Sequence, residues 1–417
     1  MNFKIKNDLN KSLYFLVFGL QALTILSNIF IYGYVSRVFG EEAFGEFSVY
    51  KRFFAFIFTF STLGISVALP RQMIVQDEKK YFYFISSALI LLIPCLILIT
   101  IVFILKEYVT ELIFNSLDYV ILTELILISL PFYLYNILIV AYLRGIMKIF
   151  ESNLLVTLTS LCYFITIFFS DSVHNLILIN NICIFITTII FHKLYIKFSF
   201  RRFTLKNINE PIKKLFSYGF PRIVGDVSLE SFSTLPVLLM TKASGIVSAG
   251  YLSIGITFVK MIALIGSPLS NILLPVVSKK FKENNYKEIY SDLKKLLKIF
   301  VPFGLVSNII LYFGSGTIIL IVLGPQSSEA EYIIKFISFV SAPILIFNLF
   351  RSINDAIYHY AINSVICFLS LIIFYLLYLL LSISLYDITD SILISFVCSY
   401  FCMAIFSFYF FKQKKIS

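Results

Sequence analysis

The chain has 417 residues, of which 59% are hydrophobic and only 14% are charged. This balance excludes a soluble globular protein, because it leaves too little polar surface to meet water. The formal net charge of +11 would suit a nucleic-acid-binding protein, but the basic residues gather in the short segments between long apolar runs. The composition therefore predicts an all-α integral membrane protein whose positive charge sets its topology.

Apolar runs long enough to cross a bilayer recur along the chain. A helix needs about twenty apolar residues to cross about 30 Å of hydrocarbon. Twelve runs meet this length: Leu13–Val35, Phe47–Leu69, Tyr81–Leu105, Tyr119–Leu143, Leu154–Ser170, Leu176–Ile196, Leu215–Met240, Val247–Leu274, Leu296–Val322, Tyr332–Phe350, Ile362–Leu385 and Ile392–Phe411. The first is too long for a signal peptide and has no small-residue cleavage site, so we expect it to remain as a membrane helix.

The basic residues indicate the orientation of these helices. With the N-terminus in the cytoplasm, 26 of the 34 Lys and Arg residues fall in cytoplasmic segments, whereas the outer loops hold only Arg37, Lys106 and Lys242. This asymmetry follows the positive-inside rule. It predicts cytoplasmic N- and C-termini, and in a bacterium the inner membrane.

A weak internal repeat relates the two halves of the chain. Adding 205 to residues 36–70 gives seven identical pairs, among them Gly40 with Gly245, Gly45 with Gly250 and Ser48 with Ser253. Paired halves are typical of transporters. We therefore expect an N-terminal lobe of helices 1–6 (residues 1–196), a cytoplasmic linker (197–214) and a C-terminal lobe of helices 7–12 (215–417).

Eight charged residues lie within the expected helices. Each costs about 2.5–3.5 kcal/mol near the bilayer centre, so each should face protein or water. We expect four cations to bind substrate and three acids to couple ions or protons, while Lys335 is near enough to the outer surface to reach it. The four cations are Lys51, Arg52, Arg222 and Lys260, and the three acids are Glu124, Asp226 and Glu230.

Two interpretations of these charges remain open. Arg222 is four residues before Asp226 and can pair with it, while Glu230 lies deeper and has Lys260 on the next helix as its obvious partner. The four charges form either an ion-pair ladder that only joins helices or a cationic cavity with titratable acids. Lys51 and Arg52 either line the mouth of that cavity or pair with the nearby acids Glu41, Glu42 and Glu46.

Glycines and prolines near these charges are candidate hinges. We expect breaks in helices 7 and 8, because alternating access uses discontinuous helices beside a central cavity. The candidate gating residues are Gly40, Gly45, Pro70, Pro221, Gly225, Pro236, Gly266, Pro268 and Pro275.

Several kinds of chemistry have no sequence signal. The chain has no GxxxxGK[ST] phosphate loop, no GxSxG and no HExxH motif. Its six cysteines lie within apolar runs without a CxxC pair, and its three histidines are scattered. We therefore expect neither an enzyme nor a bound cofactor or metal.

The motifs taken together resemble the Wzx-type polysaccharide repeat-unit flippases. The resemblance rests on Gly40-x4-Gly45-x2-Ser48, its repeat Gly245-x4-Gly250-x2-Ser253, and Leu143-Arg144-Gly145 at the end of helix 4, with Arg351 at the corresponding end of helix 10. These flippases belong to the MOP superfamily, which also holds the MATE drug exporters and the MurJ lipid II flippase.

This resemblance implies a fold and a substrate. The fold is two six-helix lobes around a central cavity, and the substrate is an undecaprenyl-pyrophosphate-linked oligosaccharide moved to the outer leaflet. The cavity cations would hold the pyrophosphate. The implied partners are this substrate, membrane lipids and the polysaccharide polymerase and chain-length machinery. The placement of the basic residues in topogenic segments excludes nucleic acid as a partner.

Two other functions remain as alternatives. An ion-coupled drug or metabolite exporter of the same fold would be expected to carry acids in helix 1, yet Leu13–Val35 has no charged residue. A membrane enzyme such as a polysaccharide polymerase or ligase would resemble its relatives in a large outer loop with basic residues, which this chain lacks.

Overall fold

The computed structural model describes residues 3–75, 79–196, 206–265, 277, 280–281, 283, 285–324, 328–358, 361–384 and 387–413. These residues form helices joined by short turns, with no strand among them. Eleven of the helices are long and apolar enough to cross a membrane, and a bent pair, Glu41–Ser61 and Ile65–Ile74, makes up to twelve within the described part of the chain. The expected all-α, multi-pass membrane fold is confirmed, and each expected span overlaps one of these helices.

The chain divides into two compact units. Unit 1 comprises Met1–Ala43 and Phe53–Ile223, and unit 2 comprises Phe44–Arg52 and Val224–Ser417. Two helices thus contribute to both units: α2 (Glu41–Ser61) gives its residues 44–52 to unit 2, and α9 (Lys206–Ser244) gives its first eighteen residues to unit 1. The units therefore divide at residue 223, beyond the linker expected at 197–214, and a piece of the N-terminal half packs with the C-terminal half.

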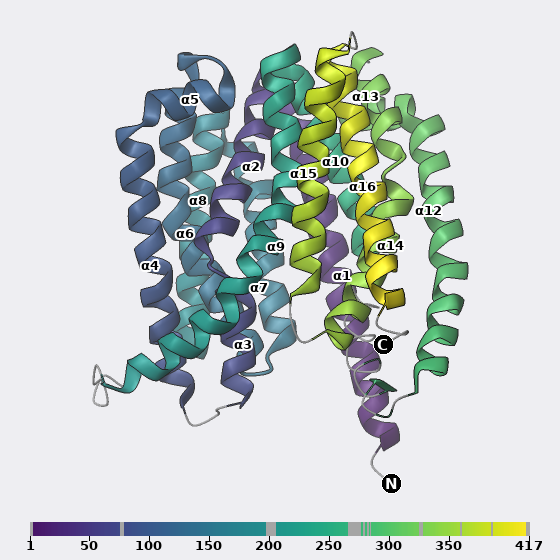
Figure 1. Ribbon diagram of the computed structural model, residues 1–417. Coiled ribbons are helices and arrows are strands. Elements are labelled where there is room, and N and C mark those ends of the chain that lie inside the picture. The colour runs from purple at the N-terminus through teal and green to yellow at the C-terminus, as the bar shows by residue number, and fades with distance from the viewer. Residues whose placement is uncertain are drawn as a thin grey trace. The chain divides into compact units, whose positions relative to one another are not determined.

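Unit 1 is built around α6, which packs against α3, α4, α5, α7 and α8 (Figure 1). Side-chain hydrogen bonds join α6 to α8, from Asn136 to Thr188 and from Asn181 to Ser129, each at 2.8 Å. In an apolar surrounding such bonds hold helices together. The α-helices that lie wholly within this unit are α1 (Phe3–Tyr34), α3 (Ile65–Val75), α4 (Lys80–Ile104), α5 (Lys106–Phe114), α6 (Val120–Gly145), α7 (Ile149–Thr166) and α8 (Val173–Tyr195).

Within the described residues, unit 2 contains the rest of α9 together with α10, α12, α13, α14, α15 and α16. Of these, α15 and α16 lie side by side (Figure 1). The side of α15 that faces protein carries Ile366, Ser370 and Phe374 at four-residue spacing, whereas Leu376 and Leu380 are exposed as expected for contact with lipid. The bounds of these helices are α10 (Ile246–Ile265), α12 (Tyr286–Val322), α13 (Ser328–Ser338), α14 (Ser341–Ile357), α15 (Ile362–Ile383) and α16 (Ile388–Gln413).

The internal repeat is visible in the backbone of the connecting turns. Gly40 precedes α2 with a φ of +96°, and Gly245, 205 residues later, precedes α10 with a φ of +92°. This left-handed conformation favours glycine, because a Cβ would be strained there. Gly40, a candidate hinge from the sequence, and its repeat partner Gly245 therefore occupy equivalent turns, each directly before a helix.

Within unit 2, α2 crosses α10 at a second pair of repeat-related glycines. A Cβ on Gly45 would lie 2.5 Å from the carbonyl oxygen of Ile246, and one on Gly250 would lie 3.1 Å from the Cα of Gly45. Glycine is needed because the backbones approach too closely for any side chain. This crossing fixes the register between the charged part of α2 and α10.

The expected helix breaks lie elsewhere. Helix α9 is continuous from Lys206 to Ser244 through Pro221 and Pro236, so the break predicted for helix 7 is wrong. Membrane helices tolerate proline because neighbouring groups satisfy the freed carbonyl. The break is instead a 41° bend between α2 and α3, at Thr62–Gly64, and Pro70 lies inside α3. The expected hinges Gly266, Pro268 and Pro275 lie outside the described residues.

The α2–α10 crossing predicts the effect of adding a methyl group. Gly45→Ala should lower the free energy of unfolding by about 1–3 kcal/mol, because the neighbouring atoms are backbone and give way poorly. Gly19→Ala is the matched control, since a Cβ there meets nothing within 4 Å. Thermal unfolding of both variants in detergent measures the difference, and equal midpoints would contradict the close packing.

Candidate functional site

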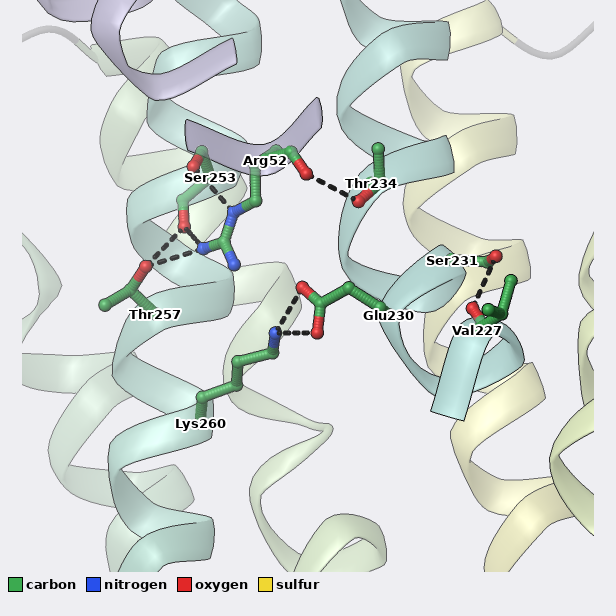
Figure 2. Close-up of polar contacts among 8 residues, drawn as sticks. All are labelled: Arg52, Val227, Glu230, Ser231, Thr234, Ser253, Thr257 and Lys260. Atoms are coloured by element: carbon green, nitrogen blue, oxygen red, sulfur yellow. Dashed lines mark hydrogen bonds and ion pairs between the residues drawn. The ribbon is translucent and has the colours of Figure 1, made fainter. Parts of the chain in front are cut away.

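Three of the charges singled out in the sequence meet in unit 2. Arg52 comes from α2, Glu230 from α9 and Lys260 from α10, and Figure 2 shows their side chains converging between these helices. They are 178 and 30 residues apart along the chain, so only the crossing of α2 with α10 and the packing of α9 bring them together. We call these three residues the charged cluster.

Arg52 is the buried member of the charged cluster, with 7% of its surface exposed. Its Nε donates to Ser253 Oγ at 2.9 Å, and its Nη2 donates to Thr257 Oγ1 at 2.6 Å and to the Ser253 carbonyl oxygen (Figure 2). Thr234 Oγ1 of α9 in turn donates to the Arg52 carbonyl oxygen at 3.1 Å. Arg52 of α2 therefore bonds to two other helices, to α10 through its side chain and to α9 through its carbonyl oxygen. All of these partners are neutral, so the bonds do not cancel its positive charge.

Lys260 and Glu230 form the ion pair expected from the sequence. Lys260 Nζ lies 3.1 Å from Glu230 Oε1 and 3.3 Å from Oε2, so it binds both carboxylate oxygens (Figure 2). Glu230 is one turn before Thr234 on α9, and Lys260 is one turn after Thr257 on α10, which places the pair next to Arg52. The side chains are 20% and 36% exposed, so the pair is reachable by solvent or by a ligand.

The charged cluster carries a net positive charge. Two cations and one carboxylate leave one unit of positive charge in a partly buried site, where electrostatic attraction is stronger than in water. Arg52 is bound by neutral oxygens, and Lys260 has one carboxylate partner. Both cations can donate hydrogen bonds to a phosphate or carboxylate ligand. The arrangement therefore favours an anion over a cation.

Asp226 has a different partner from the one expected. Its Oδ1 lies 3.6 Å from Nη2 of Arg351 on α14, whereas Arg222, its predicted partner, lies with its guanidinium 4.1 Å from the ring centroid of Tyr218. Asn363 of α15 donates to the Arg351 carbonyl oxygen at 2.9 Å. Arg222 belongs to unit 1 and Asp226 belongs to unit 2. The predicted ion-pair ladder is therefore divided between the two units.

The other candidate residues lie apart from the charged cluster. Lys51 is next to Arg52 in sequence, but its Nζ lies 5.2 Å from the centroid of the Phe47 ring on its own helix. Glu124 pairs with Lys106 at 2.8 Å in unit 1, and Lys335 pairs with Glu331 at 2.6 Å within α13. These placements fit topology and packing more simply than substrate binding.

Gly225 positions the helix that carries Asp226 and Glu230. A Cβ on Gly225 would lie 2.9 Å from the Cα of Ser364, so α9 packs directly on α15 at this point. Its neighbour Asp226 is thereby placed beside Arg351, whose carbonyl α15 also binds through Asn363. Gly225 thus has a packing role that the sequence did not reveal.

Comparisons with known proteins identify the fold. Residues 14–281 match the model of a family described as polysaccharide biosynthesis protein. A search of curated proteins finds no match. An inward-facing multidrug resistance MATE family transporter of the MOP superfamily aligns with a TM-score of 0.76 and 14% identity, covering 96% of this chain and 97% of that chain.

Two further solved structures have the same fold. The lipid II flippase MurJ in an inward closed conformation gives a TM-score of 0.75 at 17% identity, covering 95% of this chain and 87% of that one. A MOP superfamily transporter from Pyrococcus furiosus gives 0.71 at 13% identity, covering 96% and 94%. The expected MOP fold is confirmed.

The Lys260–Glu230 pair predicts a reciprocal effect on stability. Lys260→Met and Glu230→Gln should each cost more than the roughly 0–1 kcal/mol of a surface pair and less than the about 3–5 kcal/mol of a fully buried one. Exchanging the two residues (K260E/E230K) should restore most of the loss, as measured by thermal unfolding in detergent. Lys335→Met is the control for an ion pair confined to one helix, and an exchange that restores nothing would contradict direct pairing.

Proposed function

The chain belongs to the polysaccharide biosynthesis protein family, and on this premise we propose that it is a flippase for undecaprenyl-pyrophosphate-linked oligosaccharide units. It would turn this substrate across the bacterial inner membrane by alternating access, with both termini in the cytoplasm, as part of the assembly of a surface polysaccharide such as O-antigen or capsule. The observation that carries the proposal is buried Arg52, a cation bound by neutral oxygens beside Lys260.

A net-positive cluster suits a protein that moves a diphosphate headgroup across the hydrocarbon of a membrane. A diphosphate headgroup has a prohibitive free energy in hydrocarbon, because charged groups lose their hydration there. Fixed cations on transmembrane helices replace part of that hydration with charge-assisted hydrogen bonds. Arg52 and Lys260 are placed to supply them, while the lipid tail remains in the bilayer.

Glu230 gives the cluster a means of changing its charge. While Glu230 is ionised it holds Lys260 at 3.1 Å, which weakens that lysine as an anion site. Protonation of Glu230 would release Lys260 and raise the net charge of the cluster by one unit. We propose that protons or cations arriving at Glu230, with Asp226 as a second acid, reset the transport cycle.

An exporter of drugs or metabolites is the second candidate, because the MATE transporter shares the fold over nearly the whole chain. The charged cluster disfavours a cationic drug as substrate, because the buried positive charge of Arg52 would repel it. A polymerase or ligase partner would act after transport and not in this chain, so we propose a transporter rather than an enzyme.

Removal of either cluster cation should strongly reduce transport. Arg52→Ala and Lys260→Ala should each reduce surface polysaccharide at least about tenfold, the effect of losing one strong charge-assisted bond. The test is complementation of a deletion strain, with polysaccharide measured on the cell surface and protein measured in the membrane. Lys335→Ala is the control cation, and normal polysaccharide in both cluster variants would refute this role.

The coupling proposal has its own test. Replacing both acids with amides (D226N/E230Q) should abolish surface polysaccharide while the protein still inserts, because neither position can then cycle between charged and neutral forms. Glu124→Gln is the matched control, since Glu124 pairs with Lys106 in unit 1. Full polysaccharide in the double variant would exclude coupling through these acids.

A further inference from the structure

A second group of cations lies in unit 1, around the ring of Tyr218. The guanidinium carbon of Arg71 is 4.3 Å from the ring centroid and that of Arg222 is 4.1 Å from it. Arg71 Nη1 also donates to the Tyr218 hydroxyl. The two guanidinium groups therefore lie no farther apart than the sum of these distances, although like charges repel.

The backbone of unit 1 holds this group in place. A Cβ on Gly64 would lie 2.6 Å from the Gly219 carbonyl oxygen, and a Cβ on Gly219 would lie 2.7 Å from the Leu63 carbonyl oxygen. The turn that precedes α3 and the part of α9 next to Tyr218 thus touch backbone to backbone. Arg222 follows Tyr218 by one helical turn and shares its face, and Arg71 reaches the same ring from α3.

The nearby acids already have other partners. Glu210 pairs with Lys79 at 2.7 Å and with Lys214 at 2.6 Å, and Asp226 pairs with Arg351. The contacts described for Arg71 and Arg222 are the ring and hydroxyl of Tyr218. Stacking occupies the faces of planar guanidinium groups and leaves their edges, which carry the N–H donors, for an oxygen acceptor.

We propose that Arg71, Tyr218 and Arg222 form a binding site for the diphosphate group of a polyprenyl diphosphate. This inference rests on the proposed function and adds a site in unit 1 to the charged cluster of unit 2. Two guanidinium forks match the oxygens of two linked phosphates, and the negative charge of the diphosphate relieves the repulsion between the arginines. By the topology expected from the sequence, Arg71 lies at the cytoplasmic end of its helix, where the lipid-linked substrate is made available.

The test measures binding by the purified full-length chain in detergent. Farnesyl diphosphate is the probe, because it carries the diphosphate on a short isoprenoid, and titration calorimetry gives the affinity. Arg71→Gln and Arg222→Gln should each weaken binding about tenfold, as expected for one charge-assisted contact. Tyr218→Leu should weaken it similarly, whereas Tyr218→Phe, which keeps the stacking surface, should weaken it less.

Controls separate this site from general basic character and from lipid binding. Lys213→Gln removes an exposed cation from the same helix and should leave the affinity unchanged. All variants should bind equally well to nanodiscs that contain phosphatidylglycerol. The proposal is overturned if the arginine variants match Lys213→Gln, or if they lose phosphatidylglycerol and keep farnesyl diphosphate.

The outcomes also distinguish this site from the proposed function. The unit 1 site alone is overturned if the purified Arg71 and Arg222 variants bind farnesyl diphosphate as tightly as the wild-type protein while Arg52→Ala reduces surface polysaccharide in cells. Wild-type protein that binds no diphosphate probe overturns both proposals.

Discussion

The close crossing of α2 and α10 at Gly45 and Gly250 is the constraint on which the charged cluster depends. Backbone contact at this point sets the register of the two helices. It places Arg52, two turns after Gly45, within hydrogen-bond distance of Ser253 and Thr257. A side chain at either glycine would separate the helices and move a buried guanidinium away from its oxygens. Since a buried cation without hydrogen bonds is costly, packing and electrostatics here depend on one another.

A second glycine contact does the same for unit 1. Gly64 and Gly219 bring α3 and α9 together, and the two arginines on Tyr218 follow from that contact. In both units, then, a small-residue crossing of two helices positions guanidinium groups that neutral partners hold. Membrane helices lack a hydrophobic drive to associate with one another, so close backbone approach and polar contacts have a larger share in deciding where helices meet.

The sequence predicted the helices from apolar length, the repeat from an offset of 205 residues, and the Lys260–Glu230 pair from two opposite charges deep within consecutive helices. It failed where the answer depends on which helices touch. Arg351 lies 125 residues from Asp226, and no pattern near either residue indicates the pair. Pro221 and Pro236 predicted a break in α9 that the packed helix does not need, whereas the bend at Thr62–Gly64 has no proline to announce it.

The charged cluster also shows why an internal repeat has to be imperfect to be useful. The residues equivalent to Arg52, Lys260 and Glu230 under the 205-residue offset are Thr257, Ala55 and Ile25, none of them charged. A strictly repeated sequence would place a second arginine at position 257, facing Arg52 across the crossing, and the two would repel at short range. A threonine there instead accepts a hydrogen bond from Arg52 at 2.6 Å. The glycines that fix the crossing are kept in both halves while the charges are not, so one shared backbone geometry supports one site with a net positive charge.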